Sequence, residues 1–148
     1  MKISVIIPTR NEEKQIGHLI DHIRTTASDF PTEIIVVDGK SSDNTLTIAK
    51  DKADIAIRGS ESCRGTQMHE GAETSSGSVL VFLHADTRLP DNWQNALSLA
   101  WLHPHKPVAT AFKLSFDQNR LYYRFMSSMA NFRTQWITRV PHGDQAIA

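Results

Sequence analysis

Near the start of the chain stands the stretch Lys2-Ile3-Ser4-Val5-Ile6-Ile7-Pro8-Thr9-Arg10-Asn11-Glu12. Residues 2–7 are mostly β-branched and show no regular polar alternation, which is typical of a strand that is buried on both faces. The polar residues after this strand predict a turn. The next apolar residues recur at the spacing of one helix face, at Ile16, Leu19, Ile20 and Ile23. The stretch therefore predicts a strand, a loop and an amphipathic helix.

The same alternation continues along the chain. Further strands are predicted at residues 33–37, 53–57, 79–83 and 108–116. Further helices are predicted after an N-cap signal at residues 41–43, at residues 65–74, from Pro90 to about Leu102, and at residues 122–140. Strands that alternate with helices indicate an α/β fold, with a mostly parallel sheet and helices on both of its faces.

The length, charge and composition of the chain exclude several classes of protein. The 148 residues fit one domain. Sixteen basic and sixteen acidic residues give a formal net charge of zero, so no global positive field favours nucleic acid as a partner. The apolar runs are too short to cross a bilayer and residues 1–9 are unlike a signal peptide, so we expect a cytoplasmic protein. The single cysteine, Cys63, excludes an internal disulfide and a thiolate-rich zinc site.

Three of the predicted strands end in polar turns. These turns are Pro8-Thr9-Arg10-Asn11-Glu12, Asp38-Gly39-Lys40-Ser41 and His84-Ala85-Asp86-Thr87. In an open parallel sheet, ligands bind beyond the carboxyl ends of the strands, so we expect the functional site at these turns. The sequence has no dinucleotide fingerprint, P-loop, zincin motif or nucleophile elbow, which argues against dehydrogenase, NTPase, zinc protease and α/β-hydrolase chemistry.

With the residues around them, the three turns resemble the successive motifs of family 2 glycosyltransferases, whose GT-A fold binds nucleotide-diphospho-sugars. The form Leu83-His84-Ala85-Asp86-Thr87 and the late Gly143-Asp144-Gln145 are most similar to a small bacterial branch, the radical-SAM/selenodomain-associated or arsenosugar-biosynthesis-type transferases. The resemblance covers nearly the whole chain and implies one catalytic domain over residues 1–148. Such proteins usually continue well beyond Gly-Asp-Gln, so we expect the usual C-terminal segment to be missing here.

The resemblance implies a donor site built from these strand ends. Thr9 and Glu12 would line the nucleoside pocket, and Pro8, which ends the strand, would belong to the same nucleotide-sugar site. Asp38 would accept a hydrogen bond from a ring N–H of the base. Read from the residues alone, Glu12 could instead be a carboxylate at a helix start, and Asp38 could be only a turn former.

An Arg-Gly-x-Gln motif adds two residues to the implied donor site. Arg64 and Gln67 match it at a predicted helix start, where N–H groups and arginine side chains suit phosphate. Arg64 would contact the diphosphate or the sugar. The alternative for Arg64 is an exposed charge at the start of a helix.

The resemblance also implies a divalent cation. The last carboxylate of the family's Asp-x-Asp motif binds Mg²⁺ or Mn²⁺, and Asp86 holds that position here. A hard cation there would bridge diphosphate oxygens and stabilise the leaving group. His84 replaces the first aspartate and could bind metal, face the sugar or pack in the core, with Ala85 between the two in the donor site. The alternative for Asp86 is a simple turn carboxylate.

An inverting transfer needs a carboxylate that takes the proton from the acceptor hydroxyl. The resemblance assigns this role to Asp144, and the alternative is that Asp144 lies in a frayed terminus. The hypothesis is thus a metal-dependent, inverting glycosyltransferase that uses a UDP-sugar and an unidentified acceptor. A nucleotide-sugar-binding module or inactive fragment is the alternative. A sugar-phosphate nucleotidyltransferase is less favoured, since no Gly-rich basic loop follows the first strand.

The helix predicted at residues 122–140 mixes aromatic residues, methionines and arginines. Such a helix could lie on a membrane surface and meet a lipid-linked acceptor. It could also cover the sheet, or a partner subunit in a homo-oligomer.

Overall fold

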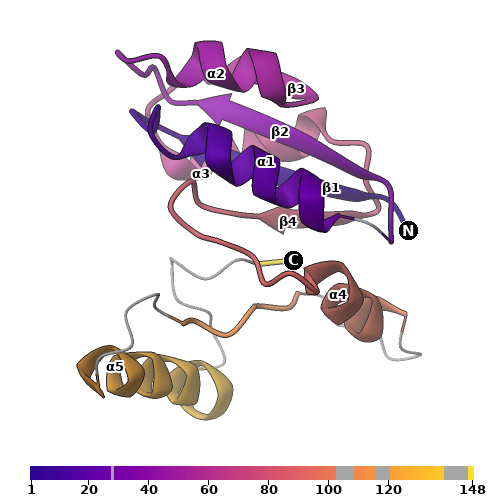
Figure 1. Cartoon of the computed structure of the whole chain (residues 1–148), viewed down its shortest axis with the longest axis vertical. Helices are drawn as coiled ribbons and strands as arrows, with labels where there is room; N and C mark the ends of the chain where they lie inside the picture. Colours follow the sequence, from indigo (N-terminus) through magenta and orange to yellow (C-terminus); the bar gives the residue numbers. More distant parts are fainter. Residues whose placement is uncertain (28, 103–108, 116–120, 139–146) are drawn as a thin grey trace.

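The computed structural model describes residues 1–27, 29–102, 109–115, 121–138 and 147–148. Within them, a parallel sheet is formed by β1 (Ile3–Thr9), β2 (Thr32–Asp38), β3 (Ile55–Arg58) and β4 (Val79–Phe82), in the order β3-β2-β1-β4 (Figure 1). The first strand in the sequence therefore lies in the middle of the sheet. The predicted α/β class with a parallel sheet is confirmed.

The central strand β1 is buried along its whole length, as its apolar sequence predicts. It pairs with β2 from Ile3 to Thr9, but with β4 only as far as Ile6. The strand was predicted to end before Pro8, and this is wrong by two residues. Ile6 accepts a hydrogen bond from Leu83, just after β4. Because alternate residues of a strand bond to the same side, the missing N–H of Pro8 faces the space beyond β4 and breaks no ladder bond.

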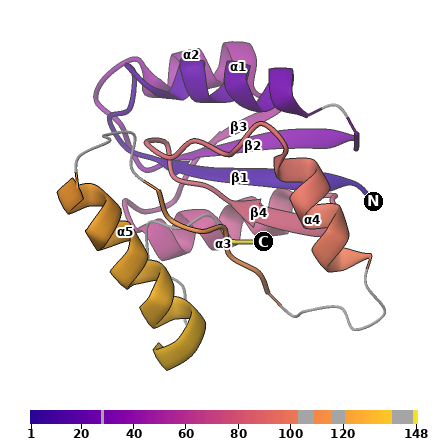
Figure 2. The ribbon, with the colours of Figure 1, turned by 60° about the horizontal axis from the view of Figure 1, so that its bottom comes forward.

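Helices cover both faces of the sheet, as predicted (Figure 2). On one face lie α1 (Ile16–Thr26), α2 (Thr45–Lys52) and α4 (Trp93–Trp101), and on the other lies α3 (Arg64–Thr74). The larger apolar core is on the first face, where Ile20 of α1, Trp93 of α4 and Val36 of β2 belong to one buried cluster. Gly71 lets α3 lie close against β1, because a Cβ at this position would stand 2.4 Å from the side chain of Ile6.

The segment after α4 differs from the sequence prediction. No strand forms in the described part of the segment predicted at 108–116, which is residues 109–115; only an isolated bridge joins Ala111 to Ile147. The place beside β4 is already taken, because Ile147 exchanges hydrogen bonds with Phe82, with N···O distances of 2.8 and 3.2 Å. Residues 109–115 therefore lie one position farther out, where Thr110 bonds to Ala148.

The predicted helix at 122–140 begins at Leu121. It is α-helical as α5 (Leu121–Phe132) and continues as a π-helix, η1 (Arg133–Thr138). Residues 139 and 140 lie outside the described residues. Among the helices that the structure describes, none combines the length and apolar character needed to cross a bilayer.

Candidate functional site

The loops after β1 and β2 are locked together by reciprocal hydrogen bonds. Asn11 N–H donates to Ser41 Oγ, and Ser42 N–H donates to Asn11 Oδ1, both at 2.9 Å. Asn11 and Lys40 adopt the left-handed conformation, with φ of 56° and 62°. Asparagine is enriched in that region, whereas lysine is not. This interlock was not predicted from the sequence, where the asparagine is its one local signal.

Asp38 ends β2 inside this frame and is fully buried. Its Oδ2 accepts a hydrogen bond from Ser41 N–H at 3.1 Å, which is the turn-forming contact expected of an aspartate before glycine. Its Oδ1 is buried and has no hydrogen-bond partner among the described residues. Buried polar atoms in proteins are nearly always paired, so this oxygen is suited to a donor that arrives with a ligand.

Gln67 brings α3 to the ends of both central strands. Its Nε2 donates to the carbonyl oxygens of Thr9, at 2.9 Å, and Val37, at 2.7 Å. A Cβ on Gly39 would stand 2.9 Å from the same nitrogen, so the glycine leaves room for the amide. The structure thus gives Gln67 and the backbone of Thr9 a clear part in shaping this edge. Thr9 itself is buried beside Gly39 N–H, which bonds to its carbonyl at 2.8 Å.

Asp86 follows β4 and is exposed at the same edge. It lies in a turn closed by a hydrogen bond from Thr87 N–H to the carbonyl of His84 at 3.0 Å. His84 is half-buried and Ala85 is buried. Asp86 also borders a cavity of about 470 Å³ against the outer side of α1, whose lining includes Lys14 and Arg88.

The carboxylate of Glu12 is influenced by the charges of two neighbouring aspartates, Asp86 and Asp43. Burial is the main cause that raises its pKa above the usual value, and the negative charges of Asp86 and Asp43 raise it further. Its backbone N–H donates to Thr45 Oγ1 at 2.8 Å. Glu12 and Asp86 are therefore close enough to repel each other, and a cation between them would relieve this repulsion.

The carboxylates at this edge suit a divalent cation, but only if a bound ligand supplies part of its coordination. The described residues contain no group of three His, Cys, Asp or Glu side chains that could hold a metal by themselves. Mg²⁺ and ions like it are commonly held by one or two carboxylates together with substrate phosphates. Asp86, with Glu12 nearby, could supply that protein share.

Arg64 is the first residue of α3 and is exposed. The N–H groups at this helix start favour negative charge. Hydrogen bonds from Thr66, and then from Gly65, lower the pKa of the neighbouring Cys63 thiol. An anionic ligand group beside Arg64 would meet the same donors.

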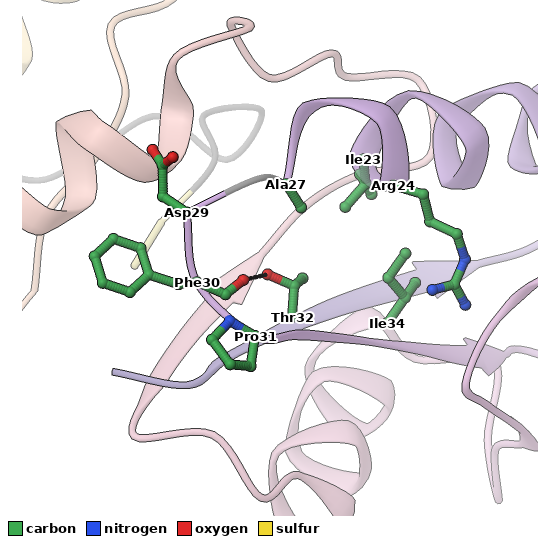
Figure 3. A pocket seen from close by; sticks show the side chains of 8 residues that line it. All are labelled: Ile23, Arg24, Ala27, Asp29, Phe30, Pro31, Thr32 and Ile34. Carbon is green, nitrogen blue, oxygen red and sulfur yellow. Dashed lines mark hydrogen bonds between the residues drawn. The ribbon is translucent and has the colours of Figure 1, made fainter.

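Two predicted or expected features lie elsewhere. Asp144, predicted as the general base, lies outside the described residues. A larger cavity of about 580 Å³ lies where α1 ends and β2 begins, at the opposite edge of the sheet (Figure 3). Its cation Arg24 is already engaged with Asp54 at 3.1 Å and with the carbonyl of Lys52. The larger cavity is therefore not the candidate site.

The carboxyl edge thus joins two interlocked turns, an unpaired carboxylate oxygen, a helix start and an exposed aspartate. Residues 4–146 match Glycosyl transferase family 2. The chain belongs to this family. This confirms the family-level resemblance seen in the sequence.

Relatives that are similar in sequence to this family 2 chain carry glycosyltransferase names. A PGL/p-HBAD biosynthesis glycosyltransferase of Mycobacterium bovis is 34% identical over 140 residues, which cover 82% of this chain and 54% of that protein. An O-antigen chain rhamnosyltransferase of Salmonella typhimurium is 33% identical over 96 residues, covering 62% of this chain and 30% of that protein. The chain therefore spans about half, or less, of the length of these relatives.

Solved structures share the fold. A mannosyltransferase from Pyrobaculum calidifontis, in complex with GDP-Man and Mn²⁺, has a TM-score of 0.69 at 23% identity and covers 98% of this chain and 43% of its own. Glucosyl-3-phosphoglycerate synthase from Mycobacterium tuberculosis, in complex with Mn²⁺, UDP and glucosyl-3-phosphoglycerate, has a TM-score of 0.67 at 22% identity and covers 99% and 56%. The predicted GT-A-type fold is confirmed.

Proposed function

We propose that this chain is the donor-binding part of a metal-dependent, inverting glycosyltransferase that moves a sugar from a nucleoside diphosphate to an acceptor hydroxyl. The observation that carries the proposal is the buried, unpaired Oδ1 of Asp38 at the carboxyl edge. Uracil and guanine carry a ring N–H that a carboxylate can accept from, whereas cytosine and adenine carry a bare ring nitrogen at that position. Asp38 therefore favours UDP or GDP donors, and the UDP assignment made from the sequence stays within this pair.

In this proposal, the remaining residues orient the donor. Asp38 fixes the base, while Gln67 and Gly39 keep the strand ends in place below it. Arg64 and the start of α3 face the diphosphate. Asp86, with Glu12 beside it, would hold Mn²⁺ or Mg²⁺, which supplies positive charge to the departing diphosphate. The solved relatives that hold GDP-Man or UDP together with Mn²⁺ support this part of the proposal.

Other parts of the proposal rest on the sequence resemblance. They are the general base Asp144, inversion at the sugar carbon, and kinship with the radical-SAM/selenodomain-associated branch. A cytoplasmic location and one catalytic domain over residues 1–148 also stay predictions. The role of His84 stays open between metal binding, sugar contact and packing.

The test is calorimetric titration of the chain with UDP, GDP, CDP and ADP, each with and without Mn²⁺. We expect UDP or GDP to bind, and the Asp38→Asn variant to bind it about 10- to 150-fold more weakly, because a hydrogen bond to a charged group contributes about 1.5–3 kcal/mol. Asp86→Asn should remove the Mn²⁺ dependence. Asp51→Asn, which changes an exposed aspartate on α2, is the matched control and should bind as the unchanged chain does.

A folded chain that binds no nucleotide, or one that binds all four bases equally and ignores Asp38→Asn, would contradict the proposal. Product analysis separates the alternatives. A glycosyltransferase releases nucleoside diphosphate from the sugar donor. A nucleotidyltransferase releases pyrophosphate from a nucleoside triphosphate and a sugar phosphate, and a binding module releases neither.

A further inference from the structure

The large apolar side chains of helix α5 are exposed to solvent, not turned towards a core. Apolar residues of α5 and one of the following η1 form what we call the apolar stripe, and they are 43% to 83% exposed: Leu121, Phe125, Met126, Met129 and Phe132 of α5, and Trp136 of η1. None of the twelve residues of α5 is buried. In α1, by contrast, the apolar residues are the buried ones. An exposed stripe of this kind marks an interaction surface.

The polar side of α5 is the side that faces the rest of the chain. Asn131 Oδ1 accepts from the N–H of Leu114 and its Nδ2 donates to the carbonyl of Leu114, both at 2.8 Å. By the 3.6-residue repeat, Asn131 lies about 100–120° around the helix from Phe125 and Phe132. The contact with residues 109–115 therefore points the apolar stripe outward, and α5 stands at the periphery of the molecule (Figures 1 and 2).

The charged residues in the sequence of the α5 segment, between Asp117 and Asp144, have one sign. Residues 118–143 contain four arginines and no aspartate or glutamate. Two of these, Arg124 and Arg133, are exposed on or next to α5 itself. Arginines that flank an aromatic and methionine face are the pattern of a helix that lies in a membrane interface, with attraction to anionic lipid. A two-fold dimer through the same face would bring Arg124 and Arg133 of both copies to one interface with no acidic residue of the segment 118–143 to pair with them, which disfavours a second copy as the occupant.

We propose that α5 docks this domain on the surface of a bilayer that contains anionic lipid, with the apolar stripe in the headgroup region and Arg124 and Arg133 against lipid phosphates. The inference goes beyond the proposed donor chemistry. It is tested without nucleotide, so its failure leaves that chemistry untouched.

The test is flotation of the chain with vesicles of phosphatidylcholine alone and of phosphatidylcholine mixed with phosphatidylglycerol. We expect binding to the mixed vesicles that weakens in high salt. Phe125→Ser with Phe132→Ser should lower the partition coefficient at least about tenfold, since two apolar side chains leave the interface. Arg124→Gln with Arg133→Gln should lower it roughly twenty- to thirtyfold on mixed vesicles, because each cation near an anionic surface contributes roughly fivefold.

The matched control is Leu99→Ser with Leu102→Ser, which removes two equally exposed leucines, 73% and 67%, from the end of α4. This variant should bind vesicles as the unchanged chain does. Because all these side chains are exposed, circular dichroism melting should show each variant folded. The proposal is overturned if a folded chain does not float, or if the control loses binding as strongly as the α5 variants. It is equally overturned if size-exclusion chromatography shows a dimer that only the phenylalanine variants dissociate and that does not bind vesicles.

Discussion

Glu33 holds the amino edge of the sheet and provides a test of the fold's electrostatics. Its carboxylate accepts hydrogen bonds from Ser4 Oγ on β1 and from Ser76 N–H, the latter at 2.6 Å, and it pairs with Lys2 at 3.2 Å. Burial alone would raise the pKa of Glu33, but the hydrogen bonds from Ser4, Ser76 and Lys2 outweigh it and lower the pKa from 4.5 to about 2. One charged group thus joins β1, β2 and the segment before β4.

The sign of the pH effect follows from this direction. A carboxyl whose pKa is lower in the folded state stabilises the fold above its unfolded pKa, and the contribution is lost as the pH falls towards the folded pKa. Here the window runs from about pH 4.5 down to about 2. The shift corresponds to ~3 kcal/mol, and solvent at the exposed Lys2 reduces our expectation to ~2 kcal/mol.

The assay is urea unfolding of the chain and of Glu33→Gln between pH 7 and pH 2.5. We expect the variant to be less stable by ~2 kcal/mol at pH 7, and the difference to shrink steadily below pH 4.5. Other carboxylates titrate in both proteins and cancel in the difference. A difference in unfolding free energy that stays constant from pH 7 to pH 2.5 would refute the reasoning.

Two further substitutions test the packing of α3. Gly71→Ala should destabilise the chain by about 1–3 kcal/mol in urea unfolding, because the new Cβ would meet Ile6 at 2.4 Å. The control is Gly65→Ala in the same helix, whose Cβ would meet no atom within 4 Å and which should be neutral or stabilising. Equal losses of unfolding free energy in the two variants would contradict this. Gln67→Leu removes the amide donor from the carbonyls of Thr9 and Val37, of which Thr9 keeps its bond from Gly39 N–H, and should cost about 1–3 kcal/mol. Unchanged stability with weaker nucleotide binding would instead make Gln67 purely a ligand contact.

Much of the fold was predictable because its signals are local. The buried runs of β1 and β2 and the 3.6-residue spacing in α1 identify their elements without knowledge of the partners. The predicted strand at 108–116 failed because strand formation depends on a free neighbour. Ile147, far along the chain, occupies the position beside Phe82 that such a strand would need.

The location of the candidate site was predictable from the sequence, but the contacts of its side chains were not. The strand ends locate the edge, since parallel strands place their carboxyl ends together. The partners of each side chain depend on loop conformation, which the sequence signals weakly. Neither the left-handed Lys40 nor the reach of Gln67 to two carbonyls has a local signature. The role predicted for Gln67 at the donor stays a prediction beside its backbone contacts.

The order of strands in the sheet has a consequence during synthesis. β1 pairs with β2 soon after both leave the ribosome, but its other edge waits for β4, which follows 41 residues after β2 and only then covers Ile3 to Ile6. At ordinary rates of translation this interval lasts roughly 2 to 9 seconds. During that time β1, which is buried along its whole length in the fold, presents an open edge to other strands. Chaperone demand and aggregation should therefore be set by the speed with which residues 39–82 are translated, and slow codons there should lower the yield of folded protein.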